Sequence, residues 1–150
     1  MTEDLSSLAG NLTVTGHELL QRVYFEDTDF SGRVYHARYL NFLERGRSDY
    51  LRLLGISHRD LAAQGLSFAV HRMEIDFLRP ASIDDVLLIR TAPRSIGGAR
   101  IVLAQEALLG EMPVVAAHVT VALLGPGDRP QRLRAAIRAA FGSQPVSARR

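Results

Sequence analysis

The chain has 150 residues, of which 47% are hydrophobic and 23% charged, so its composition fits one globular domain and excludes wholesale disorder. It has no cysteine, which excludes disulfides and cysteine-ligated metals, and its five histidines show no paired metal-ligand spacing. The formal net charge of +2 at pH 7 argues against a nucleic-acid-binding protein. Without a membrane-length apolar run or a basic signal-peptide start, the sequence predicts a cytoplasmic protein.

In chain order, the first predicted element is a strand at residues 17–25, after a small and polar segment, 1–15, that we expect to be flexible. Polar residues and a glycine predict a loop at 26–37. Apolar side chains spaced by three, four and seven over 37–54 predict a long amphipathic helix. Gly46 lies on its apolar stripe, where a close approach by another backbone would explain a residue that disfavours helix.

The second half of the chain is predicted to be mainly strands. A short helical turn at 57–65 comes first, and the strand-like segments are 66–77, 85–91, 99–109 and 114–124. The sequence between the last two segments predicts a hairpin turn. A short helix, basic on one side, is predicted at 130–141, and a flexible tail at 143–150.

One long helix and five strands can bury a core only if the sheet curls around the helix, which makes a two-layer α+β fold at 16–142. We expect the last four strands to pair as an antiparallel meander. An open sheet leaves an edge strand, and dimerisation that joins two edges into one continuous sheet is an economical way to cover it.

Two aspartates, Asp27 and Asp29, lie shortly before the long helix. In an extended chain they face the same side, and a helix N-terminus carries unpaired amide donors. A carbonyl bound there would be polarised, and an acid upstream could act on its carbon as general base or nucleophile. The same pattern also occurs as a helix cap with a solvated turn and, less often, as a Mg²⁺ site. These residues alone leave the three interpretations open.

The stretch YFEDTDFSGRVYHARYLNFLERGRSDYLRLLG, residues 24–55, resembles the acyl-CoA thioesterases of the hot-dog fold. It is most similar to their Tol–Pal-associated, YbgC-type branch, which is related to 4-hydroxybenzoyl-CoA thioesterase. The matching positions are Asp27, Thr28, Asp29, Ser31, Gly32, Tyr35, His36, Tyr39, Phe42, Glu44, Arg45 and Arg47. A weaker match covers residues 74–91, and the whole resemblance spans about residues 22–124.

The resemblance implies a hot-dog domain, in which an antiparallel five-stranded sheet wraps a long central helix. It implies a homodimer or homotetramer with active sites between subunits. It also implies hydrolysis of a coenzyme A or acyl carrier protein thioester without a metal or other cofactor, coenzyme A being part of the substrate. Asp29 would be the catalytic carboxylate, the backbone amide of His36 would polarise the thioester carbonyl, and the His36 side chain would assist.

The residues that we expect to bind substrate are Gly32, Tyr35, Phe30, Phe68, Arg79, Arg94 and Arg100. The three arginines lie at predicted strand ends or turns, where cationic groups would meet the phosphates of coenzyme A. Phe30 and Phe68 would contact the acyl group.

Two other functions fit the same sequence. A hot-dog hydratase or dehydratase would use His36 as its base. A non-catalytic acyl-thioester binding or scaffolding domain would join a membrane-associated or acyl-carrier complex through its basic C-terminal helix, with Arg132, Arg134 and Arg138 facing an acidic partner. The ordinary alternative for that helix is a solvated surface.

Overall fold

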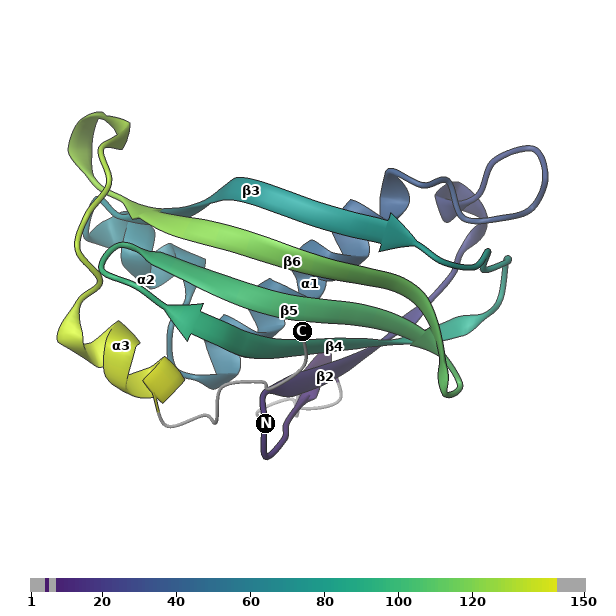
Figure 1. The fold of residues 1–150 in the computed structure, drawn as a ribbon, viewed down its shortest axis with the longest axis horizontal. Helices are drawn as coiled ribbons and strands as arrows, with labels where there is room; N and C mark the ends of the chain where they lie inside the picture. Colours follow the sequence, from purple (N-terminus) through teal and green to yellow (C-terminus); the bar gives the residue numbers. More distant parts are fainter. Residues whose placement is uncertain (1–4, 6–7, 143–150) are drawn as a thin grey trace.

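The computed structural model describes residue 5 and residues 8–142 of the chain (Figure 1). Its strands are β1 (Asn11–Leu12), β2 (His17–Arg22), β3 (Ser67–Phe77), β4 (Val86–Ile96), β5 (Arg100–Leu109) and β6 (Met112–Leu124). Its helices are α1 (Arg38–Leu53), α2 (His58–Ala63) and α3 (Ala135–Gly142), with 3₁₀ turns at η2 (Phe25–Asp27) and η3 (Pro126–Asp128). In the described part of the chain, no helix has both the length and the apolar character needed to span a membrane.

The six strands form one antiparallel sheet in the order β1-β2-β4-β5-β6-β3. The five predicted strands are all present, and the turn between Leu109 and Met112 confirms the predicted hairpin. The sixth strand, β1, has two residues, lies inside the segment expected to be flexible, and pairs with β2. The predicted tail, 143–150, lies outside the described residues.

The expected meander of the last four strands is wrong in one respect. β4, β5 and β6 are consecutive neighbours, but β3 pairs with β6, for example Phe77 with Val115, and not with β4. The reason is that β4 takes the place beside β2, with His17 opposite Thr91. β3 therefore forms the edge of the sheet opposite β1, and its outer side is unpaired in the described part of the chain.

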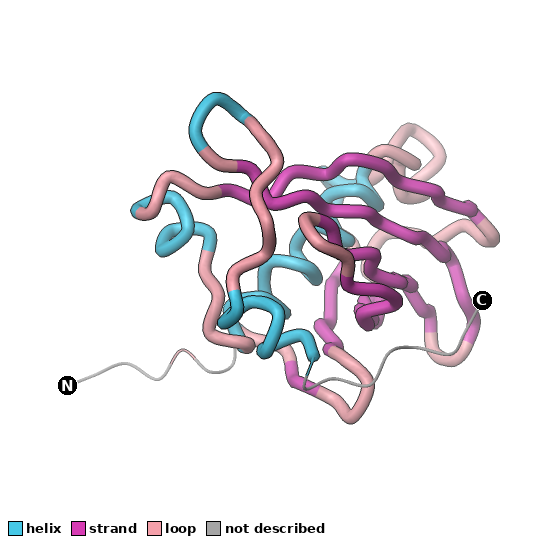
Figure 2. The backbone as a smooth tube through the Cα atoms, turned by 60° about the vertical axis from the view of Figure 1, so that its left-hand side comes forward, coloured by secondary structure: helices cyan, strands magenta, loops and turns pink. Residues whose placement is uncertain are grey.

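The sheet curves around α1, which confirms the hot-dog fold. In Figure 1, α1 runs behind the strands along their length, and Figure 2 shows the strands bending around it. The helix buries its apolar stripe completely at Phe42, Leu43 and Tyr50, against sheet side chains such as Ile89 and Val119. Removing this apolar surface from water is the main force that holds the two layers together.

Gly46 lies in the tightest contact between α1 and the sheet. A Cβ at this position would lie 2.8 Å from Ile89 Cγ2 and 3.3 Å from Thr91 Oγ1, so no larger residue fits without a shift. The expectation that another backbone approaches Gly46 is therefore wrong within the chain, because the neighbouring atoms belong to side chains of β4 and β5.

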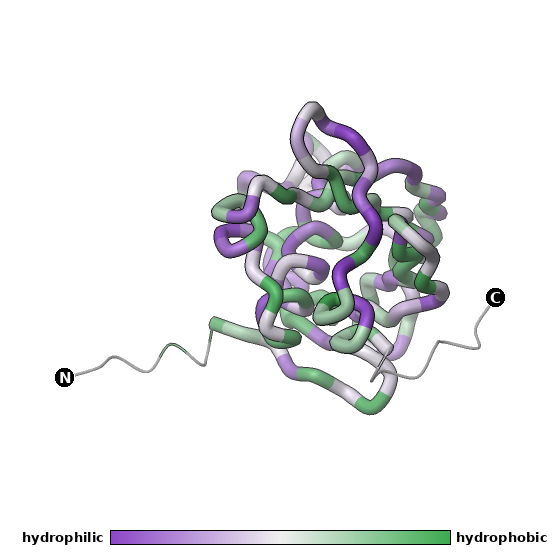
Figure 3. Tube along the Cα trace, turned by 90° about the vertical axis from the view of Figure 1, so that its left-hand side faces the viewer, coloured by the Kyte–Doolittle hydropathy of each residue, from purple (hydrophilic) through white to green (hydrophobic). Residues whose placement is uncertain are grey.

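The C-terminal helix begins later than predicted, at Ala135 rather than at residue 130. The intervening segment is extended because its amides bond to other elements. Gln131 N–H donates to Leu123 O (2.7 Å), and Leu133 N–H donates to Gly98 O (2.8 Å). The segment and α3 close the end of the domain that faces the viewer in Figure 3, where hydrophilic and hydrophobic stretches alternate along the chain.

Candidate active site

The loop between β2 and α1 is built on Asp27, whose side chain is almost completely buried at 1% exposure. The Tyr24 N–H donates to Asp27 Oδ2 (2.9 Å), and Arg38 Nε donates to Oδ1 (2.6 Å). The Tyr35 N–H donates to the Asp27 carbonyl (3.0 Å). The hydrogen bond that Arg38 donates to Asp27 raises the pKa of the Arg38 guanidinium above its ordinary value. Asp27 therefore ties the start of the loop to the first turn of α1.

Asp29 opens a tight turn that projects from this loop. The Gly32 N–H donates to Asp29 O (3.0 Å), and the Asp29 N–H donates to Arg33 O (2.9 Å). Gly32 has φ +76°, a left-handed conformation that favours glycine. The turn is held from outside, because the Ile83 N–H donates to Gly32 O (3.0 Å). Asp29 thus has a defined backbone although it lies in a loop.

The Asp29 carboxylate is exposed and accepts two hydrogen bonds from one neighbour. Ser31 donates to Asp29 Oδ1 from its backbone N–H (2.8 Å) and from its hydroxyl (2.5 Å). The hydroxyl bond is the main cause that lowers the pKa of Asp29 below its ordinary value, followed by the backbone bond. The group is therefore ionised at neutral pH, which is the form that a general base or a nucleophile requires.

The start of α1 offers backbone donors next to this turn in the chain. The first bonds of the helix run from Arg38 N–H to Tyr35 O (2.8 Å) and from Tyr39 N–H to His36 O (3.3 Å). Within the described residues, the N–H groups of His36 and Ala37 have no hydrogen-bond acceptor. Unpaired amides at a helix start can polarise a bound carbonyl.

The His36 ring is exposed and lies at the C-terminal end of β3. Its centroid is 4.7 Å from that of Tyr35 and 6.0 Å from that of Phe77, the last residue of β3. Phe30, at the tip of the Asp29 turn, is fully exposed, and Tyr35 is about half exposed. Five of the predicted site residues therefore share one loop: Asp29, Phe30, Gly32, Tyr35 and His36.

Arg79 follows β3 at this same end of the domain, and its guanidinium donates to Pro113 O (3.2 Å). Arg33, which sequence reasoning did not single out, lies in the Asp29 turn, and its charge also lowers the pKa of Asp29. Cations at such positions can pair with phosphate groups. Among the described residues, no group of three or more histidine, aspartate or glutamate side chains is placed to hold a metal ion.

Arg94 and Arg100 lie away from this loop in the single chain. Arg94 Nη1 bonds to His118 Nε2 (3.1 Å), and His118 alternates with the core residues Ala117 and Val119. Arg94 therefore lies on the face of the sheet that points away from α1. Arg100 begins β5 opposite Ala122, whereas Arg79 contacts the other end of the β5–β6 hairpin. One chain does not bring the three arginines together.

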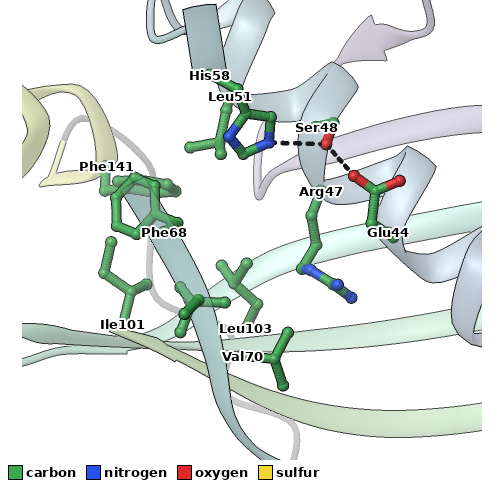
Figure 4. Close-up of a pocket in the computed structure, with 12 residues that line it drawn as sticks. Glu44, Arg47, Ser48, Leu51, His58, Phe68, Val70, Ile101, Leu103 and Phe141 are labelled. Carbon is green, nitrogen blue, oxygen red and sulfur yellow. Dashed lines mark hydrogen bonds between the residues drawn. The ribbon is translucent and has the colours of Figure 1, made fainter. Parts of the chain in front are cut away.

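Phe68 lines a separate cavity of about 140 Å³ between α1 and the sheet (Figure 4). The other apolar walls come mainly from Ile101, Leu103 and Phe141. The polar lining residues are Glu44, Arg47, Ser48 and His58. Of the residues that line this cavity, only Phe68 is predicted from the sequence to contact the acyl group. A usable signal was present, because Arg47 lies four residues after Leu43 on the apolar stripe of the predicted helix.

The chain is similar to known thioesterases over most of its length. The family profile described as Thioesterase superfamily (4HBT) matches residues 31–116. The acyl-CoA thioesterase YbgC of Haemophilus influenzae is 39% identical over 122 residues, which are 80% of this chain and 90% of that protein. The acyl-CoA thioester hydrolase YbgC of an Escherichia coli strain is 38% identical over 118 residues, 75% of this chain and 88% of that protein.

Solved structures agree with this similarity. A probable thioesterase from Bartonella henselae is 48% identical, with a TM-score of 0.76 over 79% of this chain and 99% of that chain. A 1,4-dihydroxy-2-naphthoyl-CoA thioesterase from Synechocystis shares the fold, with a TM-score of 0.78 at 21% identity over 83% of this chain and 94% of that chain.

Proposed function

Because the chain belongs to the thioesterase superfamily, we propose that it is an acyl-CoA thioesterase in which Asp29 carries the chemistry. It cleaves an acyl-CoA thioester with water to give a free carboxylic acid and coenzyme A. One observation carries the assignment to Asp29: its ionised carboxylate stands on a braced turn a few residues before two unpaired helix-start amides.

The proposed reaction begins when the thioester carbonyl oxygen accepts hydrogen bonds from the amides of His36 and Ala37. Negative charge that develops on this oxygen is then stabilised by fixed dipoles. Asp29 either removes a proton from a water that attacks the carbonyl carbon, or attacks that carbon itself to form an anhydride that water cleaves. In both routes the carbon–sulfur bond breaks and the sulfur leaves as the thiolate of coenzyme A, which takes up a proton.

We propose that a second copy of the chain completes the site, because β3 has a free edge and exposed apolar side chains. Val70 and Phe77 are 49% and 48% exposed, and a long unpaired edge favours pairing with another strand. In an antiparallel β3–β3 pair, the Phe77 end of one copy meets the Phe68 end of the other. The Asp29 loop of one copy would then approach the cavity of its partner.

Two further proposals concern the carrier of the acyl group and the place of the protein in the cell. Arg33 and Arg79 would contact the phosphates of coenzyme A, or the phosphate of an acyl carrier protein. Arg132 and Arg134 precede α3, so they are not part of a basic helix, and Arg134 and Arg138 bond to Gln64 and to Gly97 O. The predicted basic helix that would dock a membrane-associated complex is therefore not formed as expected, and a cytoplasmic location stays a prediction.

A thiol-release assay over short, long, branched and aromatic acyl-CoAs tests the function directly. We expect turnover of at least one saturated thioester, with release of one thiol per acid formed. Water addition to an enoyl-CoA without thiol release would instead identify a hydratase. Binding of thioesters without cleavage of any would identify a non-catalytic domain.

Isotope labelling separates the two routes open to Asp29. In a single turnover in H₂¹⁸O, an anhydride that water cleaves at the aspartyl carbon gives an acid product without ¹⁸O and places the label in the enzyme, which identifies direct attack. General-base catalysis places the label in the product, as does water attack on the acyl carbon of an anhydride, so a labelled product requires a second test, chemical trapping of the anhydride.

A further inference from the structure

Arg47 lies in the core of the domain without a carboxylate partner. The residue is only 9% exposed, which is rare for an arginine. Its Nη1 donates to Gln105 Oε1 (3.0 Å). The amide nitrogen of Gln105 in turn donates to Leu43 O and to Thr91 Oγ1, both at 2.9 Å. Among the described residues, no acidic oxygen lies within ion-pair distance of Arg47.

A buried guanidinium with only a neutral partner is costly, and burial accordingly lowers the pKa of Arg47 below its ordinary value. The guanidinium has five N–H donors, of which one bonds within the described chain. In Figure 4 the side chain extends from α1 toward the strands that carry Leu103 and Val70, and Arg47 is one of the residues that line the cavity. Its free donors therefore face a space in which a ligand could supply acceptors.

The polar rim of the cavity does not compete for these donors. Ser48 Oγ donates to Glu44 Oε1 (2.5 Å), and His58 Nε2 lies 2.9 Å from Ser48 Oγ. Since the single hydroxyl proton of Ser48 goes to Glu44, His58 donates to Ser48. Glu44 is exposed, so water screens its charge from an anion deeper in the cavity, while the same charge favours the ionised form of Arg47.

The cavity limits the size and character of such a ligand. Its volume of about 140 Å³ is close to the roughly 150 Å³ of an engineered apolar cavity that binds benzene. Phe68, Ile101, Leu103 and Phe141 provide apolar walls. The space therefore suits one aromatic ring or a short branched hydrocarbon, with one charged group at the Arg47 side.

We propose that this cavity binds a small apolar carboxylate, whose two oxygens accept hydrogen bonds from Arg47 while its hydrocarbon part fills the apolar walls. The planar guanidinium matches a carboxylate in a two-pronged pair. The carboxylate has two possible sources: the free acid that thioester hydrolysis releases, or a remote carboxylate carried by the acyl group of the substrate. The binding step goes beyond the proposed function and does not rest on Asp29.

Calorimetric titration with benzoate, isovalerate and the neutral benzamide tests the site. We expect a carboxylate to bind the wild-type chain, benzamide to bind more weakly, and Arg47→Gln to weaken carboxylate binding about 10- to 100-fold. Arg59→Gln removes an exposed arginine from the neighbouring α2 and should leave binding unchanged. Val121→Phe keeps Arg47 but fills the cavity from the core face of β6, so it should also weaken binding and decides the matter if Arg47→Gln fails to fold.

Three results would overturn the proposal: no carboxylate binding at millimolar concentration, equal binding of benzamide and benzoate, or undiminished binding by folded Arg47→Gln. Titrating folded Asp29→Asn separates this proposal from the catalytic one, because carboxylate binding should persist there. Enzyme kinetics distinguish the two possible sources of the carboxylate. Loss of benzoate inhibition in Arg47→Gln indicates the free acid, whereas a raised KM for glutaryl-CoA but not for butyryl-CoA indicates a remote carboxylate on the substrate.

Discussion

The Asp29 turn lies in the loop before α1 and the Arg47 cavity lies along α1, and the two regions keep their charges in opposite ways. Asp29 is exposed, and its charge is supported by two hydrogen bonds from Ser31. Arg47 is buried among apolar side chains, and its charge is supported by one neutral amide. The first arrangement suits a group that must react, and the second suits a group that must recognise a ligand without water.

Within one chain, these two regions lie too far apart to contact the same short acyl group. Eleven residues of helix separate His36 from Arg47, which is about 16 Å along the axis. Phe77, beside His36, is nine residues from Phe68, or about 30 Å along β3. A short acyl group cannot bridge either distance. The two regions can serve one substrate only if different copies of the chain provide them.

The largest expected effect is the loss of turnover in Asp29→Asn. Removing a positioned acid–base or nucleophilic group should lower kcat by about 10²- to 10⁴-fold while leaving the fold intact, because the side chain is exposed. Glu26→Gln is the matched control, since it neutralises another exposed carboxylate of the same loop. Near-normal kcat in a folded Asp29→Asn chain would remove Asp29 from the mechanism.

A mixing experiment tests whether two copies build one site. Asp29→Asn and the cavity-filling Val121→Phe variant should each have low activity on a substrate whose acyl group enters the cavity. If the turn and the cavity come from different copies, mixed dimers contain one intact site. Statistical mixing should then restore about a quarter of the wild-type activity. If both parts come from the same copy, co-refolded mixtures will show no recovery in the thiol-release assay.

Asp27→Asn should affect stability more than chemistry, although Asp27 belongs to the same motif as Asp29. It removes a buried, charged hydrogen bond to Arg38, so the free energy of unfolding should fall by about 1–3 kcal/mol in urea denaturation. Glu26→Gln, which weakens an exposed pair with the same arginine, should cost less than about 0.5 kcal/mol. A loss of turnover as large as that of Asp29→Asn, without destabilisation, would reverse the two roles.

Local periodicity was enough to predict α1 to within one residue at each end, because its apolar stripe and terminal glycine are both local signals. The partner of β3 was not predictable in this way, since strand pairing depends on where the chain crosses from residue 78 to residue 85. The late start of α3 has a similar cause. Hydrogen bonds from Gln131 and Leu133 to other elements override the helical pattern of the sequence.

The candidate site likewise has a part that local sequence predicts and a part that only the fold brings together. The motif around Asp29 is contiguous in the chain, so the resemblance alone identified its residues. The Arg47 cavity depends on Gln105 and Phe68, which lie 58 and 21 residues away in sequence and meet Arg47 only in the folded domain. An arginine on an apolar helical stripe marks such a position, but the pattern does not tell which side chains face it.

Ser31→Ala gives the smallest expected effect and addresses how the exposed charge is maintained. The variant loses the hydroxyl bond that contributes most to lowering the pKa of Asp29. That pKa should rise, so the acid limb of the kcat/KM profile should move to higher pH, because only the ionised carboxylate reacts.

The sign of the accompanying stability change follows from linkage. The Asp29 pKa is lower in the folded state than its ordinary value of 3.8, so the Ser31 bonds stabilise the fold above that pH and lose their effect as the pH falls through the folded value. Wild type and Ser31→Ala should therefore differ at neutral pH and converge in acid, whereas Ser95→Ala, at an exposed position in β4, should shift neither profile. An acid limb that stays in place in Ser31→Ala would mean that the reacting carboxylate is not the one that Ser31 holds.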